Sequence, residues 1–591
     1  MRTAARYTGI FVLWTILSST LFVLLGGLWN VYPPPSMFWQ WWHYALFSDH
    51  SLFIMRLLGI SAGPATVILA IGSLRTLLRP HGRPALYGVT DWSTDEQIEN
   101  AGFRFWKKLR GGGILLGRHM IRNVLLTFPG DEHVALYAPT RTGKGVSFVI
   151  PNLLRWVGSL ICLDIKKENW KATAGARKMM GQEVYLFDPF SPTEQTARYN
   201  PFSCIDRTDK KAAFSNIQQM GNILFPDPDA DNAKFWIASA RSAWTGASAL
   251  ISETPGQPLT MDRVLELFTR PDAAQVIRDR IKLARSQGRP YTKACVQSLH
   301  DYVASASGRT DLYDSIRKSV STRLALWFNP VICAATEESD FDIRLLRQKK
   351  MSIYVAVAPG DIERLSPLLS ILFQQIINTT NTLPEDDPTV KHRVLMMLDE
   401  FPTLGAMPHL AKAFAFLAGF WIRIAIVLQD PPQLDGVYGK DMAKTILDNC
   451  GAEVVFGTKN QSLIELLSKR LGNDTAMVTT ETRPRFWPGF QWGKQRHSVH
   501  PEKRPLMLPQ EIARLPDTHQ LIFRRGVGPI KARKIRWYDD ALFFGLFRKA
   551  PEVKPIRVHM PMDSGETHAS EGASNGRNRN LRDEQQLELS R

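Results

Sequence analysis

Ala138-Pro139-Thr140-Arg141-Thr142-Gly143-Lys144-Gly145 directly follows the apolar run His133–Tyr137. It is close to G-x-x-x-x-G-K-[ST], a strand–loop–helix pattern whose backbone N–H groups and helix N-terminus wrap the phosphates of a nucleotide. Two positions depart from the pattern, because Ala replaces the first Gly and Gly145 replaces the Ser or Thr whose hydroxyl would bind Mg²⁺. The residues predicted to bind the nucleotide are Ala138, Pro139, Thr140, Arg141, Thr142, Gly143, Lys144, Gly145 and Val146, with Lys144 on the outer phosphates.

A second apolar run, Val394–Leu398, ends in the acids Asp399 and Glu400. A buried parallel strand that ends this way places carboxylates at the edge of the sheet where open α/β folds bind their ligands. We expect Asp399 to hold Mg²⁺, directly or through water, and Glu400 to polarise the attacking water as general base. The next run ends in Gln429, whose amide is predicted to sense the γ-phosphate. Together with Lys144, Glu400 and Gln429 form the predicted catalytic set, with ATP and Mg²⁺ as cofactors.

Short apolar runs alternate with helical patterns beyond residue 84. This alternation predicts an α/β fold in which buried, mainly parallel strands are joined by crossover helices. The expected strands are His133–Tyr137, Leu160–Leu163, Val184–Phe187, Ile353–Val357, Val394–Leu398, Ile424–Leu428, Glu453–Phe456, Leu521–Phe523 and a returning strand over Ile530–Tyr538.

Lys144 and Asp399 lie 255 residues apart, yet their strands should be neighbours in the sheet. A separate unit must therefore be inserted, and residues 207–332 show almost only helical periodicity, which predicts an all-α domain. The polar residues at the end of the chain predict a disordered tail. The predicted divisions are a membrane anchor over 1–83, the nucleotide-binding domain over 84–206 and 333–550, the all-α domain over 207–332 and the tail over 551–591.

The first eighty residues carry two uncharged stretches, Tyr7–Trp29 and Leu57–Leu74, of 23 and 18 residues. At 1.5 Å per residue each is long enough to approach or cross a bilayer core of about 30 Å. We predict spans over 7–29 and 53–74. Arg residues flank the pair, whereas residues 30–55 contain neither Lys nor Arg, so the positive-inside rule puts both termini in the cytoplasm and the short loop outside.

The formal net charge of the 591-residue chain is +17, while 44% of its residues are hydrophobic and 22% charged. This composition excludes global disorder, and the length predicts several domains. The basic excess indicates an anionic partner such as nucleic acid or an acidic membrane face. The five cysteines form no C-x-x-C or other metal-ligand spacing, which indicates reduced thiols in a cytoplasmic body.

Several motifs together resemble the TraG-type conjugal transfer coupling proteins of type IV secretion systems. The nucleotide loop continues as Val-Ser-Phe-Val-Ile-Pro-Asn, and Gly after the loop Lys is familiar in that family. Asp164-Ile-Lys-Lys-Glu-Asn169 is similar to its D-x-K-x-E-N segment, although family members usually carry Gly where Lys167 stands. The remaining matches are Leu398 to Gly405 (Walker B), Gln429-Asp430 to Gly439 (third motif), and Arg525-Gly526, Pro529-Ile530 and Lys534-Ile535 (C-terminal turn).

This resemblance covers roughly residues 1–545, and it implies a RecA-like P-loop ATPase similar to FtsK-type DNA translocases. Members of the family form six-fold rings at the inner membrane, where they recruit a relaxase bound to single-stranded DNA and feed it to the secretion channel. The helical insert is implicated in substrate recognition. The function predicted is therefore an inner-membrane coupling ATPase of a conjugative type IV secretion system, with homo-hexameric assembly.

Three alternatives remain at this point. In the first, the protein is a receptor that binds secretion substrates without hydrolysing ATP. In the second, it is a coupling protein that exports only protein effectors. A chromosome-segregation translocase is the third, although such proteins usually carry more spans and a winged-helix end. Arg423 and Lys440 flank the third motif and are weak candidates for a cation that a neighbouring subunit supplies, with a surface charge as the favoured interpretation of each.

Overall fold

A computed structural model describes residues 90–106, 113–228, 230–307, 310–380, 383–384, 386–482 and 496–558. The two predicted membrane spans, over 7–29 and 53–74, lie outside these residues, as does most of the predicted tail. Among the helices that are described, none combines the length and the apolar character needed to cross a bilayer.

A twelve-stranded sheet organises the protein, in the order β1-β3-β2-β14-β13-β10-β4-β9-β8-β5-β7-β6. The run from β10 to β6 is parallel throughout, and β4 lies between β10 and β9. The strands are β1 (Arg104–Trp106), β2 (Ile114–Arg118), β3 (Leu125–Phe128), β4 (His133–Tyr137), β5 (Ser159–Asp164), β6 (Glu183–Phe187), β7 (Met351–Ala356), β8 (Val394–Leu398), β9 (Ile422–Leu428), β10 (Cys450–Phe456), β13 (His519–Arg524) and β14 (Ile530–Arg533).

Alternate residues of the central strands enter two different hydrophobic cores. On β4, Ala135 and Tyr137 belong to one core, whereas Val134 and Leu136 belong to the other. Successive side chains of a strand point to opposite faces, so both faces of the sheet are buried. This explains why the central strands appear in the sequence as continuous apolar runs. The prediction of an α/β fold with a parallel sheet is confirmed, and the eight strands predicted between His133 and Phe523 are all present.

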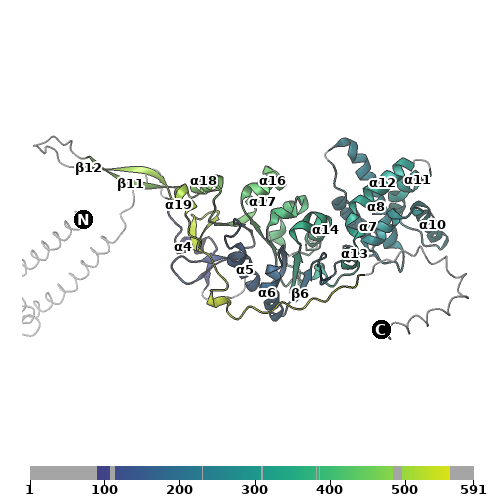
Figure 1. The fold of residues 1–591 in the computed structure, drawn as a ribbon, viewed down its shortest axis with the longest axis horizontal. Coiled ribbons are helices and arrows are strands. Elements are labelled where there is room, and N and C mark those ends of the chain that lie inside the picture. Colours follow the sequence, from purple (N-terminus) through teal and green to yellow (C-terminus); the bar gives the residue numbers. More distant parts are fainter. Residues whose placement is uncertain are drawn as a thin grey trace, which may run out of the picture. The chain divides into compact units, whose positions relative to one another are not determined.

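Helices cover the two faces of the sheet (Figure 1). One face carries α14 (Ile362–Thr380), α16 (Pro431–Tyr438) and α17 (Lys440–Asp448), and the other carries α5 (Ile150–Arg155) and α6 (Glu168–Met179). The smaller helices and helical turns are α4 (Asp95–Asn100), η1 (Gly145–Val149), η3 (Ile343–Leu345), η4 (Pro359–Asp361), η5 (Phe401–Leu404), α15 (Pro408–Ala413), η6 (Leu417–Phe420), α18 (Gln461–Arg470), α19 (Pro509–Ala513) and η7 (Ala541–Phe543).

Between β6 and β7 the chain builds a bundle of helices. Side-chain caps fix their starts: the Asp209 carboxylate accepts from two N–H groups of α7, and the Thr292 hydroxyl accepts from Cys295 N–H in α11. Gly246 lets α8 and α11 approach closely, because a Cβ there would lie 2.6 Å from Leu299 Cγ. The helices are α7 (Lys210–Leu224), α8 (Asp231–Glu253), α9 (Met261–Thr269), α10 (Ala273–Ser286), α11 (Lys293–Ser305), α12 (Thr310–Arg323), η2 (Ala325–Phe328) and α13 (Pro330–Glu337).

Some strands differ from the sequence-based expectation. The returning strand predicted over Ile530–Tyr538 ends at Arg533, and β13 is antiparallel to β10. The short strands β1, β2 and β3 were not predicted, nor was the hairpin of β11 (Asn473–Thr482) and β12 (Arg496–Pro505). Three to five residues give too short a pattern to recognise, and β12 contains mostly polar residues.

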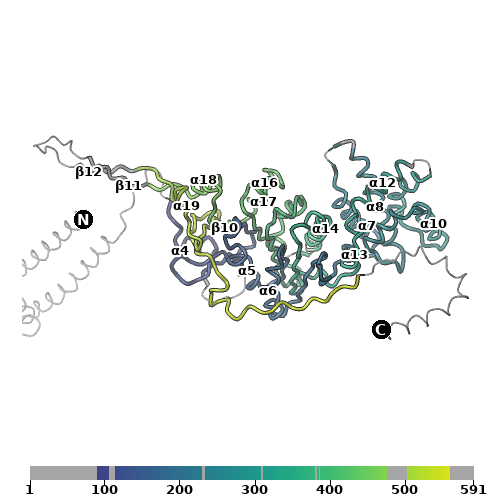
Figure 2. The backbone as a smooth tube through the Cα atoms, viewed as in Figure 1, coloured from purple at the N-terminus to yellow at the C-terminus, as the bar shows by residue number. Residues whose placement is uncertain are grey.

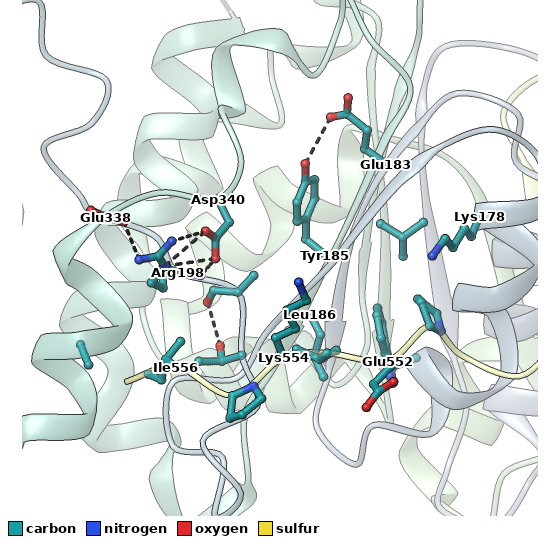
Figure 3. A pocket seen from close by; sticks show the side chains of 18 of the residues that line it. Lys178, Glu183, Tyr185, Leu186, Arg198, Glu338, Asp340, Glu552, Lys554 and Ile556 are labelled. Carbon is teal, nitrogen blue, oxygen red and sulfur yellow. Dashed lines mark hydrogen bonds and ion pairs between the residues drawn. The ribbon is translucent and has the colours of Figure 1, made fainter. Parts of the chain in front are cut away.

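The C-terminal segment, residues 548–558, runs in extended form below α5 and α6 (Figure 2). Its backbone contacts Gly175 of α6, where an added Cβ would lie 2.3 Å from Lys549 O. Farther on, Ile556 N–H donates to Glu194 O (2.9 Å) beside the edge strand β6. A cavity of about 810 Å³ lies here, lined by Lys554, Ile556 and residues of β6 (Figure 3). Residues 551–558, assigned to a disordered tail from the sequence, are therefore ordered on the sheet edge.

Candidate nucleotide-binding site

The Gly-Lys loop begins at the carboxyl end of β4 in the middle of the sheet. Ala138 N–H donates to Leu428 O (2.8 Å), so the loop starts against the end of the neighbouring strand β9. Arg141 and Gly143 both have positive φ, 63° and 85°. Alternation of this kind turns successive backbone N–H groups toward one point and forms an anion-binding concavity. Gly145 then opens the helical turn η1, which continues into α5.

Lys144 meets both predicted acids, although they are far away along the chain. Its ammonium forms an ion pair with the Glu400 carboxylate across a separation of 256 residues. The same ammonium lies 3.7 Å from Asp399 Oδ1. The parallel order β4-β9-β8 explains the contact, because β4 and β8 end at one edge of the sheet with a single strand between them. The spatial convergence expected from the sequence is present.

The two acids occupy different environments. Asp399 Oδ1 is buried, and among the residues that the structure describes it has no hydrogen-bond partner. Burial raises the pKa of Asp399 above its ordinary value, while Lys144 lowers it. An orphaned carboxylate oxygen of this kind fits a magnesium ligand, since Mg²⁺ prefers oxygen donors. Glu400 has a left-handed backbone, φ 55°, a conformation that non-glycine residues rarely adopt. Such strain is concentrated at functional sites.

The other predicted residues lie at the same edge of the sheet. Gln429 directly follows β9, and its N–H donates to Gln433 Oε1 (3.1 Å). Within the described ranges, no hydrogen bond joins the Gln429 side chain to Lys144 or to the acids. Gly145 faces open space, because a Cβ added there meets no atom of the described residues within 4 Å. The space that a Ser or Thr side chain would fill is therefore available.

Two residues beside the acids were quoted in a motif but not assigned to the site. Asp164 ends β5, the neighbour of β8, and its carboxylate accepts from Trp170 N–H (2.6 Å) and Asn169 N–H (3.3 Å). Its side chain is buried, and this burial raises the pKa of Asp164 to about 6. The Asn169 side chain in turn lowers the pKa of Asp399, against the larger effect of burial. The D-x-K-x-E-N spacing was the signal in the sequence that could have assigned Asp164 and Asn169 to the surroundings of Asp399.

The sequence-based interpretation of Arg423 was wrong. Arg423 is fully buried in β9, where its guanidinium donates to Phe128 O (3.0 Å) and to Glu132 O (3.2 and 3.1 Å). Since these contacts lie at the amino end of β9, opposite the loop, Arg423 is neither a surface charge nor a cation for a neighbouring site. Lys440 is exposed at the start of α17, in agreement with the favoured interpretation.

A parallel sheet that brings a Gly-Lys loop and an Asp-Glu strand end to one edge defines an α/β P-loop nucleotide-binding protein. The sequence model of the family described as "Type IV secretory system Conjugative DNA transfer" matches residues 91–568. The chain belongs to this family, and the resemblance to TraG-type coupling proteins is confirmed.

Individual relatives agree with this assignment. The chain is 29% identical over 538 residues to protein VirD4 of Agrobacterium fabrum, which covers 90% of this chain and 77% of VirD4. It is 28% identical over 526 residues to the conjugal transfer protein TraG of Escherichia coli, covering 82% of this chain and 80% of TraG.

The fold is similar to that of the plasmid coupling protein TrwB, solved in complex with the non-hydrolysable ATP analogue ADPNP. The TM-score is 0.53 at 18% identity, and the match covers 77% of this chain and 96% of TrwB. TrwB in complex with ADP and Mg²⁺ matches with a TM-score of 0.52 at 17% identity over the same shares. At these identities the likeness is one of fold.

Proposed function

We propose that this protein is the coupling ATPase of a conjugative type IV secretion system, which binds MgATP between the loop 138–146 and the acids 399–400. The observation that carries the proposal is the meeting of Lys144 with Asp399 and Glu400 at the carboxyl edge of the sheet. Membership in the DNA-transfer family supports DNA and secretion-system components as partners. The ligands in the TrwB structures, ADPNP and ADP with Mg²⁺, support the choice of cofactors.

Each charged residue of the site has a distinct role in this proposal. Lys144 leaves the acids to neutralise phosphate oxygens, and Asp399 offers Oδ1, which accepts no hydrogen bond from the described residues, to the metal. Bound Mg²⁺ supplies charge neutralisation at the phosphates during hydrolysis. Glu400, freed from Lys144, accepts a proton from the attacking water, and Gln429 senses the γ-phosphate from the end of β9. The strained backbone of Glu400 supports its assignment as general base.

The wider architecture is also part of the proposal. Residues 1–83 anchor the protein in the inner membrane through spans over 7–29 and 53–74, with both termini in the cytoplasm. The two parts of the nucleotide-binding domain, 84–206 and 333–550, flank an all-α domain over 207–332, which takes part in substrate recognition. Six copies form a ring that recruits a relaxase with its single-stranded DNA and passes the substrate to the secretion channel.

The decisive experiment compares the purified full chain with Glu400→Gln and Lys144→Ala. ATP hydrolysis is measured with and without single-stranded DNA, and nucleotide binding with a fluorescent ATP analogue. Removing a general base typically lowers the rate by about 10²–10⁴, so we expect Glu400→Gln to bind nucleotide but to turn over at least about 100-fold more slowly. Lys144→Ala should fold, yet show neither DNA-stimulated hydrolysis nor transfer in a mating assay.

The outcomes separate the alternatives. Nucleotide binding by the wild type without any hydrolysis would favour a substrate receptor over a motor. If the wild type hydrolyses ATP but a strain that lacks this protein still transfers DNA normally, the export of protein effectors alone is favoured. Normal transfer by Lys144→Ala would contradict the motor function itself.

A further inference from the structure

Lys534 contacts the nucleotide loop from a distant part of the chain. Its ammonium donates to Thr142 O (2.9 Å) across a separation of 392 residues. β14 is antiparallel to β13, and β13 is antiparallel to β10. β10 is in turn parallel to β4. β14 and β4 therefore point the same way, and the residue after β14 emerges at the edge of the sheet where the loop lies.

The Thr142 carbonyl occupies a special place in the loop. Thr142 lies between the two residues with positive φ, Arg141 and Gly143. Where backbone N–H groups converge on an anion, the carbonyls between them must point outward. Thr142 is also tied back to the start of the loop, because its hydroxyl and its N–H both donate to Pro139 O, at 2.6 and 3.3 Å. Lys534 thus holds the outward-facing carbonyl of the turn.

Lys534 is built into the fold rather than attached loosely to its surface. The residue is 8% exposed, and its ammonium lies 4.0 Å from the centre of the Phe456 ring. Burial lowers the pKa of Lys534 to about 8. Its own N–H donates to Thr518 O (2.8 Å), and three residues later Trp537 N–H donates to Val146 O (3.4 Å). A desolvated ammonium needs a firm acceptor, and a carbonyl provides a charge-assisted hydrogen bond.

We propose that Lys534 is a positioning residue of the nucleotide site, which holds the Thr142 carbonyl outward so that the N–H groups of the loop face the phosphates. The inference rests on the proposed function, and it adds to the site a residue from the C-terminal turn. That turn matches a motif of the family in the sequence, but the proposed mechanism of hydrolysis gives it no role.

The test uses Lys534→Met in the full chain, because Met keeps an apolar stem over Phe456 while removing the ammonium. Arg536→Met is the matched control, since Arg536 is an exposed cation two residues away. Lys534→Arg restores a donor. Hydrogen exchange of peptides spanning 138–147 is followed without nucleotide, and affinity for a fluorescent ATP analogue is measured separately. We expect faster exchange and about tenfold weaker binding for Lys534→Met, as for loss of a hydrogen bond to a charged group.

Arg536→Met should match the wild type in both measurements, and Lys534→Arg should recover part of the affinity. A merely structural role would lower the thermal midpoint and leave affinity for the analogue unchanged, which would overturn the proposal. Unaltered exchange in the loop of Lys534→Met would overturn it as well. If the wild type hydrolysed no ATP while the loop of Lys534→Met still exchanged faster, the ATPase function would fail and the positioning role would stand.

Discussion

Lys144 is shared between two carboxylates, and this arrangement determines how the site behaves before a nucleotide arrives. One ammonium offsets one full negative charge, so Asp399 and Glu400 together retain a negative excess. In the proposed mechanism, a divalent cation bound with the nucleotide would compensate that excess once Lys144 has turned to the phosphates. Asp399 Oδ1, which accepts no hydrogen bond from the described part of the chain, would be available for this exchange.

A substitution at Gly145 tests the effect of the Ser or Thr hydroxyl that usually binds Mg²⁺ at this position. Its surroundings are open and its φ is not in the left-handed region, so Gly145→Ser fits without strain and adds the hydroxyl of the usual pattern. We expect the Mg²⁺ concentration for half-maximal ATPase activity to fall severalfold. Gly145→Ala fills the same space without the hydroxyl, and its Mg²⁺ dependence should follow the wild type. Equal effects of Ser and Ala would contradict a role for the hydroxyl.

Asp164 predicts a specific dependence of stability on pH. Its pKa is raised to about 6 in the folded protein, so between about pH 4 and 6 the native state binds a proton that the unfolded state has lost. Its contribution to the free energy of unfolding therefore falls as pH rises. From pH 7.5 to 5 the wild type should gain about 1 kcal/mol relative to Asp164→Asn in chemical denaturation.

The wild type must be compared with Asp164→Asn because His133 changes the free energy of unfolding with pH in the opposite direction. Burial lowers the pKa of His133 to about 4, so its contribution to stability is lost as pH falls below its ordinary value of 6.5. Both proteins contain His133, and the difference between them isolates Asp164. Parallel pH profiles would contradict the assignment.

The strands that are buried on both faces were the ones that could be predicted from the sequence. The strands β4, β5, β8 and β9 are buried on both faces, and their continuous apolar runs made them visible in the sequence. The site residues at their ends were predictable for the same reason. β1 lacks such a pattern, because a strand of three residues shows no period. Lys534 could not be assigned to the site from sequence, since its role depends on the order of antiparallel strands.

The C-terminal segment depends on one glycine of α6. A side chain at Gly175 would meet Arg548 O at 2.4 Å and Lys549 O at 2.3 Å, and backbone atoms cannot rotate away. We expect Gly175→Ala to displace the segment while the sheet stays folded, so that trypsin cleaves after Lys549 faster than in the wild type, as mass spectrometry would detect. Gly436→Ala is the control, because Gly436 lies in α16 with open space around its Cβ position. Unchanged cleavage in Gly175→Ala would show that the segment tolerates the methyl group.

For the molecule as a whole, the formal charge of +17 predicts how DNA is bound. Contacts made mainly to phosphates release counterions, so the logarithm of the affinity for single-stranded DNA should fall linearly with the logarithm of the salt concentration, with a slope of about −0.7 per phosphate neutralised. Oligonucleotides of different sequence should bind almost equally well. Fluorescence anisotropy across a salt series measures both properties. Affinity that is insensitive to salt would indicate recognition by other contacts.

The place of β4 in the sheet has a consequence for biosynthesis. Both neighbours of β4, the strands β9 and β10, begin only at Ile422 and Cys450, 285 residues or more after Tyr137. At about 5–20 residues per second, a ribosome needs roughly 15–60 s to make that stretch. During this interval the hydrogen-bonding edges of β4 have no permanent partner, and exposed edges attract other chains. Ribosome-bound chains stalled before residue 420 should therefore crosslink to holdase chaperones through β4, and chains stalled after the sheet is complete should not. The strand that forms the nucleotide loop is made early, and both of its neighbours in the sheet are made only in the last third of the chain.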